Sequence, residues 1–310
     1  MSLIVTGSIG IDSVEAPTGV AEDVLGGSTV YFAAAASFFG KVRIVGAVGE
    51  DFPPQFLETF KHFDIDTRGL EKRAGSKTFR WRGKYHQNMN TRDTIQVQLN
   101  VLAEALPPVP REFRDSRFIF LANTDPGSQM QLLSNFPSST LSVADTMDLW
   151  IQTQRDKLGE LFTKLDGLVL NDSEAFMLTE DSNLIRAAEK IVKMGPKFVV
   201  IKKGEHGSIL MHRQGVASLP AFPARDVIDP TGAGDAFAGG FMGYLAAHCA
   251  DNTPTDNIPL HALRTAMAYG TVVASFTIES FSLDRMKQLR RGDIDRRFEH
   301  YRQMMRVGAE

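Results

Sequence analysis

From Phe118 onward, short apolar segments alternate with segments of helical periodicity, and this alternation constrains the fold more than any other feature of the sequence. Short apolar runs that lie between helical segments are typical of strands buried on both faces. Helical patterns occur near 150–164 and 182–194. The predicted strands are Phe118–Ala122, Leu141–Ala144, Gly167–Leu170 and Phe198–Ile201. The alternation predicts an α/β fold with a mostly parallel central sheet and helices on both faces.

The N-terminal part of the chain continues this pattern. Leu3–Val5 and Val42–Val48 have strand character, and each run closes at a glycine. An alanine-rich helix is expected from Ser28, a plausible N-cap, to Phe39. A second helix is expected from Pro53 to about Phe63, since proline suits a first helical turn.

Polar side chains follow several predicted strands directly. In open α/β sheets, ligands bind outside the carboxyl ends of the strands. We therefore expect these side chains to share one rim of the sheet. They are Asn123-Thr124, Asp145, Asn171-Asp172 and Lys202-Lys203-Gly204.

The segment from about 75 to 99 departs from this pattern. Lys77–Arg82 alternates polar and apolar residues, and Thr94–Leu99 does so again, with the polar, turn-rich residues Gly83–Asn88 between them. Two such strands predict a small antiparallel sheet that projects from the main body. A surface hairpin without a role is the alternative.

Composition excludes several classes of protein. The chain of 310 residues has 34 Lys and Arg against 37 Asp and Glu, a net charge of −3, whereas a nucleic-acid-binding protein usually carries a basic surface. The one cysteine, Cys249, cannot form an internal disulfide, and no apolar run is long enough to span a bilayer. A cytoplasmic protein without nucleic-acid or membrane partners is expected, either a monomer or a homodimer.

The stretch from Asp229 to Gly240 carries the strongest chemical signal. It reads Asp-Pro-Thr-Gly-Ala-Gly-Asp-Ala-Phe-Ala-Gly-Gly, and an apolar helix is expected from about Asp235 to His248. A loop of small residues that opens a helix directs backbone N–H groups outward, where the helix dipole also favours negative charge. This is an anion hole suited to a phosphoryl group.

Asp235 stands at the mouth of this anion hole, where a carboxylate would repel phosphate. That position is useful if the carboxylate takes a proton from an attacking hydroxyl. The alternative is a first-turn acid that stabilises its helix. The chain has no Gly-x4-Gly-Lys-Ser/Thr loop, and the glycine pair of this stretch lacks the third glycine of a dinucleotide-binding turn.

The stretch from Asp229 to Met242 resembles the C-terminal signature of the PfkB/ribokinase family of carbohydrate kinases. Three further features are similar to that family in order and approximate spacing, so that the resemblance covers nearly the whole chain. They are Gly26-Gly27 before the alanine-rich helix, Asn171-Asp172-Ser173-Glu174, and the presumed nucleotide loop Lys202–Gly207. The resemblance implies one domain over 1–310, a ribokinase-like three-layer αβα sandwich. Its small β lid would be formed by roughly 75–99 with contributions from about 12–25.

The resemblance also implies roles for individual residues. Asp235 would be the catalytic base, and the amides of Gly232, Ala233 and Gly234 would hold the phosphoryl group of ATP. Asn171 and Glu174 would act near Mg²⁺, with Glu174 binding through water; without the family, the same residues suggest a helix N-cap. Nucleotide binding would involve Lys202, Gly204, Gly207 and Thr231, and Asp229 would help to bind a monovalent cation such as K⁺.

At the substrate end, the resemblance makes Asp12 the acid that binds sugar hydroxyls, where a solvated turn aspartate is the alternative. Gly26 and Gly27 would let the sugar approach the backbone closely. Tyr31 and Asn123 complete the expected substrate-binding set. The aromatic residues Trp81, Tyr85, Tyr31 and Phe32 would either form a wall for a base or ring or belong to the core of the lid.

The sequence departs from the family pattern in three places. Tyr31 stands where the family often has asparagine, the spacing from Gly40 to Gly49 is one residue short, and Ala274–Phe281 lacks a glycine that is common there. The first departure indicates a different reading of the acceptor, and the third weakens the case for a cation site.

These features predict an ATP-dependent kinase that phosphorylates a hydroxyl, a primary alcohol, of a small sugar. A nucleoside kinase is the first alternative, because it shares the chemistry and adds stacking for a base. A sugar or nucleotide sensor without activity is the second alternative, which the presence of Asp235, Asn171 and Glu174 disfavours.

Overall fold

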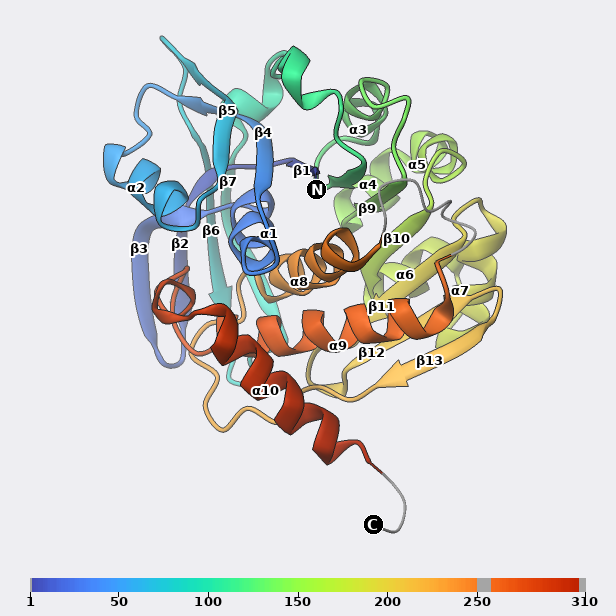
Figure 1. Cartoon of the computed structure of the whole chain (residues 1–310). Helices are drawn as coiled ribbons and strands as arrows, with labels where there is room; N and C mark the ends of the chain where they lie inside the picture. The colour runs from blue at the N-terminus through green and yellow to red at the C-terminus, as the bar shows by residue number, and fades with distance from the viewer. Residues whose placement is uncertain (1, 250–257, 307–310) are drawn as a thin grey trace.

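A nine-stranded sheet runs through the centre of the molecule (Figure 1). The structure is a computed structural model that describes residues 2–249 and 258–306. The strands from β5 to β11 are parallel to their neighbours, and β12 and β13 add an antiparallel hairpin at one edge. From that edge the order is β13 (Gly215–Leu219), β12 (Ser208–His212), β11 (Phe198–Lys202), β10 (Gly167–Asn171), β9 (Leu141–Asp145), β8 (Phe118–Leu121), β1 (Leu3–Thr6), β4 (Val42–Gly49) and β5 (Asp66–Arg73). All the predicted strands are present.

Helices cover both faces of this sheet, which confirms the predicted three-layer sandwich. One layer contains α1 (Ser28–Ser37), α2 (Pro54–His62), α8 (Ala233–His248), α9 (Leu260–Thr277) and α10 (Arg291–Met304). The other contains α3 (Pro126–Leu133), α4 (Asp148–Thr153), α5 (Arg155–Phe162), α6 (Asp172–Thr179) and α7 (Leu184–Lys193). Each layer packs its own apolar core against the sheet. In the described part of the chain, no helix is both long and apolar enough to cross a membrane.

The helix α8 lies unusually close to α1, and glycines make this approach possible. A Cβ atom at Gly239 would lie 2.3 Å from the Phe32 carbonyl oxygen, and one at Gly243 would lie 3.1 Å from the Ala36 Cα. The small residues after the Gly-Ala-Gly turn therefore let α8 pack closely against α1, which helps to fix the position of its N-terminus.

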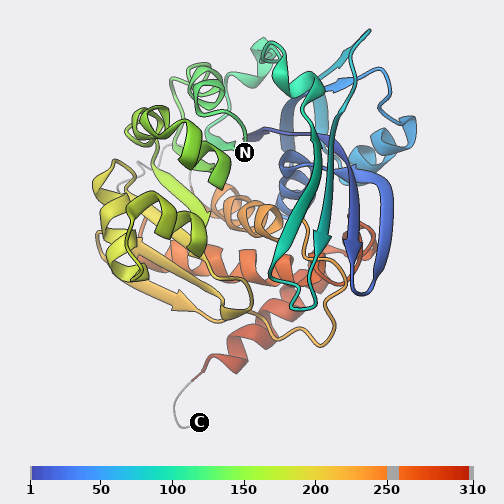
Figure 2. The ribbon, with the colours of Figure 1, turned by 180° about the vertical axis from the view of Figure 1, so that it is seen from behind.

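A second sheet of four strands, here called the small sheet, lies beside the main body (Figure 2). Its order is β3 (Gly19–Gly26), β2 (Gly10–Ala16), β6 (Phe79–Tyr85) and β7 (Arg92–Gln98). The predicted lid combined roughly 75–99 with about 12–25, and the small sheet takes its strands from these two parts of the chain. It was wrong about Gly83–Tyr85, which continue β6 rather than forming a turn, so that the hairpin turn spans 86–91.

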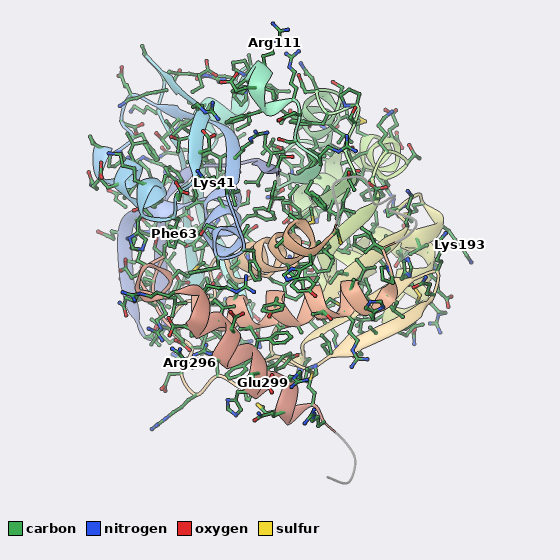
Figure 3. All side chains as sticks on the ribbon, viewed as in Figure 1. Lys41, Phe63, Arg111, Lys193, Arg296 and Glu299 are labelled. Carbon is green, nitrogen blue, oxygen red and sulfur yellow. The ribbon has the colours of Figure 1, made fainter. Side chains whose placement is uncertain are left out.

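One further difference concerns a helix. The helix expected near 150–164 is two short helices, α4 and α5, because Gln154 leaves helical geometry with φ −135° and ψ 33°. The C-terminal helix α10 packs Ile294 and Tyr301 into the core and leaves its charged face outward, where Figure 3 labels Arg296 and Glu299.

Candidate active site

The carboxyl ends of β9, β10 and β11 carry the polar side chains that the sequence placed on one rim. Asp145 ends β9, Asn171 ends β10 and Lys202 ends β11. Asn171 and Lys202 are direct partners in the strand register. The shared rim is therefore confirmed for these three residues.

The N-terminus of α8 meets this rim. Gly232, with φ 74°, is the N-cap, and a Cβ atom there would lie 2.2 Å from Tyr31 Cγ. Only glycine fits both the positive φ and the close approach. The loop before it is held by Asp229, whose carboxylate accepts a hydrogen bond from the Thr231 amide at 2.9 Å.

The three amides expected to form the anion hole are not equivalent. The Ala233 amide donates to the Pro230 carbonyl oxygen at 3.1 Å, so this donor is already engaged. For the amides of Gly232 and Gly234, the described residues provide no hydrogen-bond acceptor. Gly232 and Gly234 remain the open donors of this turn.

Asp235 lies in the first turn of α8 at this site. Burial raises the pKa of its carboxyl above the usual range, while the charges of Lys202 and Arg92 oppose that rise. Its own backbone amide also donates to the carboxylate. A carboxylate with a raised pKa, beside amides that can bind an anion, suits a general base.

Lys202 is the cation of this rim. A Cβ atom at Gly234 would lie 2.9 Å from Lys202 Nζ, so the ammonium group sits against the anion-hole turn. Its charge also opposes the rise in pKa that burial imposes on Asp145 and Glu174. Lys202 is therefore placed to neutralise a phosphate.

Asn171 and Glu174 form a capping box at the start of α6. The Asn171 side-chain oxygen accepts from the Glu174 amide at 2.8 Å, and Glu174 Oε2 accepts from the Asn171 amide at 2.8 Å. The N-cap interpretation of this motif is thus confirmed. Burial raises the pKa of Glu174. The motif holds a half-buried carboxyl beside Lys202, where a metal-bound water would be within its reach.

The loop after β11 turns back at two glycines with positive φ. Gly204 has φ 54° and Gly207 has φ 83°, and the Lys203 amide donates to the Gly207 carbonyl oxygen at 2.7 Å. A Cβ atom at Gly207 would lie 2.0 Å from the Leu219 carbonyl oxygen, which ties the loop to β13.

The opposite side of the site is formed by Asp12 on β2. Asp12 is 4% exposed, and its Oδ1 has no hydrogen-bond partner among the described residues. A Cβ atom at Gly26 would lie 1.9 Å from Asp12 Oδ2, and the Gly27 amide donates to the carboxylate. Burial raises the pKa of Asp12 to about 7, although the Gly27 hydrogen bond opposes this, and the charges of Asp229 and Asp235 raise it further. Asp12 is therefore a buried group, not a solvated turn residue.

Tyr31 fills the space between Asp12 and the anion-hole turn. It is 1% exposed, its ring packs beneath Gly232, and its hydroxyl has no hydrogen-bond partner in the described part of the chain. Burial and the nearby Asp12 and Asp229 raise the pKa of the phenol well above its usual value. Tyr31, which stands where the family often has asparagine, thus lies at the centre of the site.

Two other expected residues face elsewhere. Asn123 Oδ1 accepts from Trp150 Nε1 at 2.9 Å, and Asn123 Nδ2 contacts Met147 Sδ at 3.0 Å. Phe32 stacks on Phe120 with ring centroids 4.3 Å apart in the core. Phe32 therefore belongs to the core of the main body, and both the wall and the lid-core interpretations are wrong for it.

The small sheet reaches the site through β6 and β7 (Figure 2). Tyr85 is 6% exposed, and the Thr231 hydroxyl donates to the Tyr85 hydroxyl oxygen at 3.3 Å. At the hairpin turn, Asn90 Nδ2 donates to Glu205 Oε1 at 2.9 Å. The hairpin thus contacts both the anion-hole turn and the loop after β11.

Asp145 and Arg92 belong to the site although no role was assigned to either. Burial and the charge of Asp235 raise the pKa of Asp145 well above its usual value, and Asp145 Oδ1 lacks a partner among the described residues. Its position directly after a predicted strand was a usable signal. Arg92 carried no signal, since one arginine in a polar hairpin resembles any surface residue.

The donor set at the rim fits Mg²⁺ better than a softer metal. Asp145 and Glu174 offer oxygen atoms, and Asp145 Oδ1 is an orphaned buried acceptor. Mg²⁺ commonly binds through one or two carboxylates, several waters and substrate phosphates. The described residues contain no cluster of three or more His, Cys, Asp or Glu that would form a dedicated metal cage.

The expected K⁺ site does not fit the geometry at Asp229. Its carboxylate is engaged by the amides of Thr231 and Ser282. The Ile278 carbonyl oxygen, from the neighbouring loop, already accepts the amides of Ile228 and Asp229 at 2.8 and 3.3 Å. These oxygens stabilise the loop itself, and we propose no cation there.

Comparison with known proteins identifies the family. Residues 126–288 match the model of the pfkB family of carbohydrate kinases. The chain is also 30% identical over 250 residues to a cytidine kinase of Thermococcus kodakarensis, a match that covers 79% of this chain and 88% of that protein. The chain belongs to the pfkB family. It is therefore a kinase, a phosphotransferase with an alcohol group as acceptor.

Solved structures agree with the pfkB fold. A nucleoside kinase of Methanocaldococcus jannaschii superposes with a TM-score of 0.76 at 19% identity, covering 97% of this chain and 99% of that one. A structure from E. coli described as a ribokinase II, in complex with ATP and Mg²⁺, gives a TM-score of 0.76 at 17% identity, covering 97% and 100%. The ribokinase-like α/β fold expected from the sequence is confirmed.

Proposed function

We propose that this pfkB kinase transfers the γ-phosphoryl group of ATP to a primary hydroxyl of a nucleoside. The observation that carries the nucleoside assignment is the 30% identity with a cytidine kinase over most of both chains. The sequence alone favoured a small sugar and kept the nucleoside as an alternative. The comparisons support the alternative better.

Asp235 accepts the proton in the proposed reaction. The oxygen of the acceptor hydroxyl bonds to the γ-phosphorus, the bond from that phosphorus to the bridging oxygen of ADP breaks, and the hydroxyl proton passes to the Asp235 carboxylate. The pKa of this carboxyl, raised by burial, makes the proton transfer more favourable near neutral pH.

Charge neutralisation is the other requirement of phosphoryl transfer. Lys202 Nζ lies against Gly234, and the amides of Gly232 and Gly234 are open donors. Together they would bind the oxygens of the transferred group. Mg²⁺, held by Asp145 and through water by Glu174, would neutralise the phosphates of ATP when bound.

The acceptor would bind between Asp12 and the anion-hole turn. Asp12 Oδ1 and the Tyr31 hydroxyl are buried polar atoms without partners in the described chain, and leaving such atoms unpaired is costly. A sugar ring with adjacent hydroxyls would satisfy both. We assign the closing of the site to the β6–β7 hairpin, which acts as a lid in this proposal.

The test measures ADP release from Mg-ATP with cytidine, uridine, adenosine, inosine, ribose and fructose as acceptors. Replacing Asp235 with asparagine should lower kcat by at least about 100-fold, the usual contribution of a general base, while the Kd of a non-hydrolysable ATP analogue stays nearly unchanged. Asp226→Asn, at a carboxylate that is 77% exposed, is the matched control and should behave as the wild type.

Three outcomes would contradict parts of the proposal. Unchanged turnover in the Asp235 variant would refute its role as base. Faster phosphorylation of ribose or fructose than of every nucleoside would restore the small-sugar assignment. A wild type that binds the ATP analogue but phosphorylates none of the acceptors would support a sensor.

A further inference from the structure

Gln129, on α3, is a buried polar side chain that the proposed reaction does not use. It is 1% exposed, although its carboxamide has three hydrogen-bonding sites that water would otherwise satisfy. Burying such a group is costly unless hydrogen bonds within the protein replace those to water. The bonds that Gln129 makes are therefore a guide to its role.

The amide nitrogen of Gln129 meets three backbone oxygens. Nε2 lies 2.9 Å from the carbonyl oxygen of Leu121, 3.2 Å from that of Ala122 and 3.1 Å from that of Asp145. The opposite orientation of the amide would set Oε1 against three acceptors, so these contacts fix the donor side toward the strands. Oε1 itself has no partner among the described residues, and Gln129 thus acts through Nε2.

These bonds join the carboxyl ends of β8 and β9. The register between the two strands ends at the pair Leu121 and Ala144. Beyond this pair, Gln129 supplies the link, from Ala122 on one side to Asp145 on the other. Asp145 is the last residue of β9, so the link holds the backbone of a residue whose side chain belongs to the site.

The start of α3 determines where the Gln129 side chain lies. Asp125 caps this helix, because its carboxylate accepts a hydrogen bond from the Ser128 amide at 3.0 Å, and Pro126 occupies the first helical position. The Gln129 amide donates to the Asp125 carbonyl oxygen at 2.9 Å. The Asp-Pro pair thus fixes the turn from which Gln129 reaches the two strands.

Asp145 depends on its backbone for a defined position. Its carboxyl is buried, and Oδ1 has no hydrogen-bond partner in the part of the chain that the structure describes. Its partner in the register with β10 is Val169, whose side chain offers no donor. Mg²⁺, which the proposed function assigns to Asp145, requires nearly ideal octahedral geometry. A small displacement of the Asp145 backbone would therefore weaken metal binding.

We propose that Gln129 is a positioning residue, which sets the Asp145 carboxylate for Mg²⁺ by holding the Asp145 carbonyl oxygen. This inference rests on the proposed function, which places Mg²⁺ at Asp145, and adds a residue that touches neither the metal nor the substrates. Its contribution is to the affinity for the metal and not to the transfer step.

The test compares Gln129→Met with Gln131→Met, the same substitution at an exposed position of the same helix. Methionine has a similar length but cannot donate a hydrogen bond. Electron paramagnetic resonance measures the Kd of Mn²⁺, which takes the same oxygen ligands as Mg²⁺, in the complex with a non-hydrolysable ATP analogue. Gln129→Met should raise this Kd about tenfold or more, as is typical of residues that orient a metal ligand. Gln131→Met should stay within about twofold of the wild type.

Steady-state kinetics should separate metal affinity from the transfer step. In Gln129→Met, the Mg²⁺ concentration for half-maximal phosphorylation of cytidine should rise by about the same factor as the Kd of Mn²⁺. The kcat at saturating Mg²⁺ should stay within about threefold of the wild type. General damage to the fold would instead lower kcat at every Mg²⁺ concentration.

Two further variants keep the test decisive. Gln129→Glu preserves the shape of the side chain if Gln129→Met does not fold, which thermal unfolding without metal reveals. Protonated among the carbonyl oxygens, this carboxyl can donate one hydrogen bond, so the Kd of Mn²⁺ should lie between the wild type and Gln129→Met. In an Asp145→Asn background, Gln129→Met should change the Kd no further, because Gln129 acts through Asp145.

The outcomes distinguish this inference from the proposed function. If Gln129→Met binds Mn²⁺ as tightly as Gln131→Met while the wild type phosphorylates cytidine, Gln129 does not position the ligand and the proposed function stands. A lower kcat with an unchanged Kd would also overturn the inference. If Gln129→Met weakens Mn²⁺ binding but the wild type phosphorylates none of the acceptors, the positioning role is supported and the proposed function is refuted.

Discussion

At the scale of single residues, the site is a set of buried acids whose burial works against ionisation. Asp12 is the clearest case, since its pKa is raised to about 7. A carboxyl with a higher pKa in the folded state than in the unfolded chain binds more protons when folded. The stabilisation that protonated Asp12 contributes is therefore fully present below its unfolded-state pKa of 3.8 and is lost as the pH rises toward its folded-state pKa of about 7.

The loss of stability with rising pH gives a prediction for Asp12→Asn. The neutral amide removes the charge, so the variant should be more stable than the wild type at pH 8, by up to about 4 kcal/mol of unfolding free energy. At pH 4 the difference should nearly vanish, since Asp12 is then protonated. Urea unfolding at the two pH values measures this, and an equal difference at both would show that Asp12 titrates normally.

At the scale of elements, the β6–β7 hairpin joins two loops that are distant in sequence. Asn90 meets Glu205 at its turn, and Tyr85 meets Thr231 along its length. Apart from these two contacts, the hairpin turn carries polar side chains that bond mainly to one another. The Asn90–Glu205 hydrogen bond is thus a single contact at the hairpin turn, and its donor and acceptor can be exchanged by substitution.

We expect that exchanging the donor and acceptor roles of residues 90 and 205 restores the function that a single substitution at residue 90 removes. Asn90→Asp places two carboxylates together and should lower kcat/KM for the acceptor about tenfold or more. Adding Glu205→Gln recreates a hydrogen bond in the opposite direction and should recover most of the loss, whereas Glu205→Gln alone should have a small effect. The comparison is a double-mutant cycle, and additive effects would show that the two side chains do not couple.

Much of this architecture was predictable because it depends on local signals. The buried strands are recognisable as apolar runs, and the turn at Gly232 required glycine for reasons visible in the sequence. Arg92 and the burial of Tyr31 were not predictable. The position of Arg92 depends on which residues of the small sheet face the main body, and the burial of Tyr31 depends on how α1 packs against the turn at Gly232. No local pattern determines either contact. The engagement of the Ala233 amide was hidden for a different reason, since it depends on the backbone conformation of its own turn.

At the scale of the whole molecule, the site is divided between two parts of the chain. Asp145, Glu174, Lys202 and Asp235 lie within 126–288, the segment that matches the family model. Asp12, Tyr31, Tyr85 and Arg92 lie before it. The groups that we propose for phosphoryl transfer are thus concentrated within the matched segment, whereas Asp12 and Tyr31, which we propose to bind the acceptor, lie before it.

This division predicts the outcome of Tyr31→Asn. The substitution should change the ratio of kcat/KM for cytidine to that for ribose by about 10-fold or more, because it alters the space beside Asp12. The Kd of a non-hydrolysable ATP analogue should stay within about twofold of the wild type. Steady-state kinetics with both acceptors tests this, and parallel losses for the two would mean that Tyr31 only supports the fold.

The two tryptophans of the chain lie in these two parts of the molecule. Trp81 is on the small sheet beneath Arg92, and Trp150 is bonded to Asn123 on the main body. With Trp150 replaced by phenylalanine, the tryptophan fluorescence of the protein comes from Trp81 in the hairpin region alone. Trp81 is thus an optical reporter, without any attached dye, of the lid closure that we propose for the hairpin.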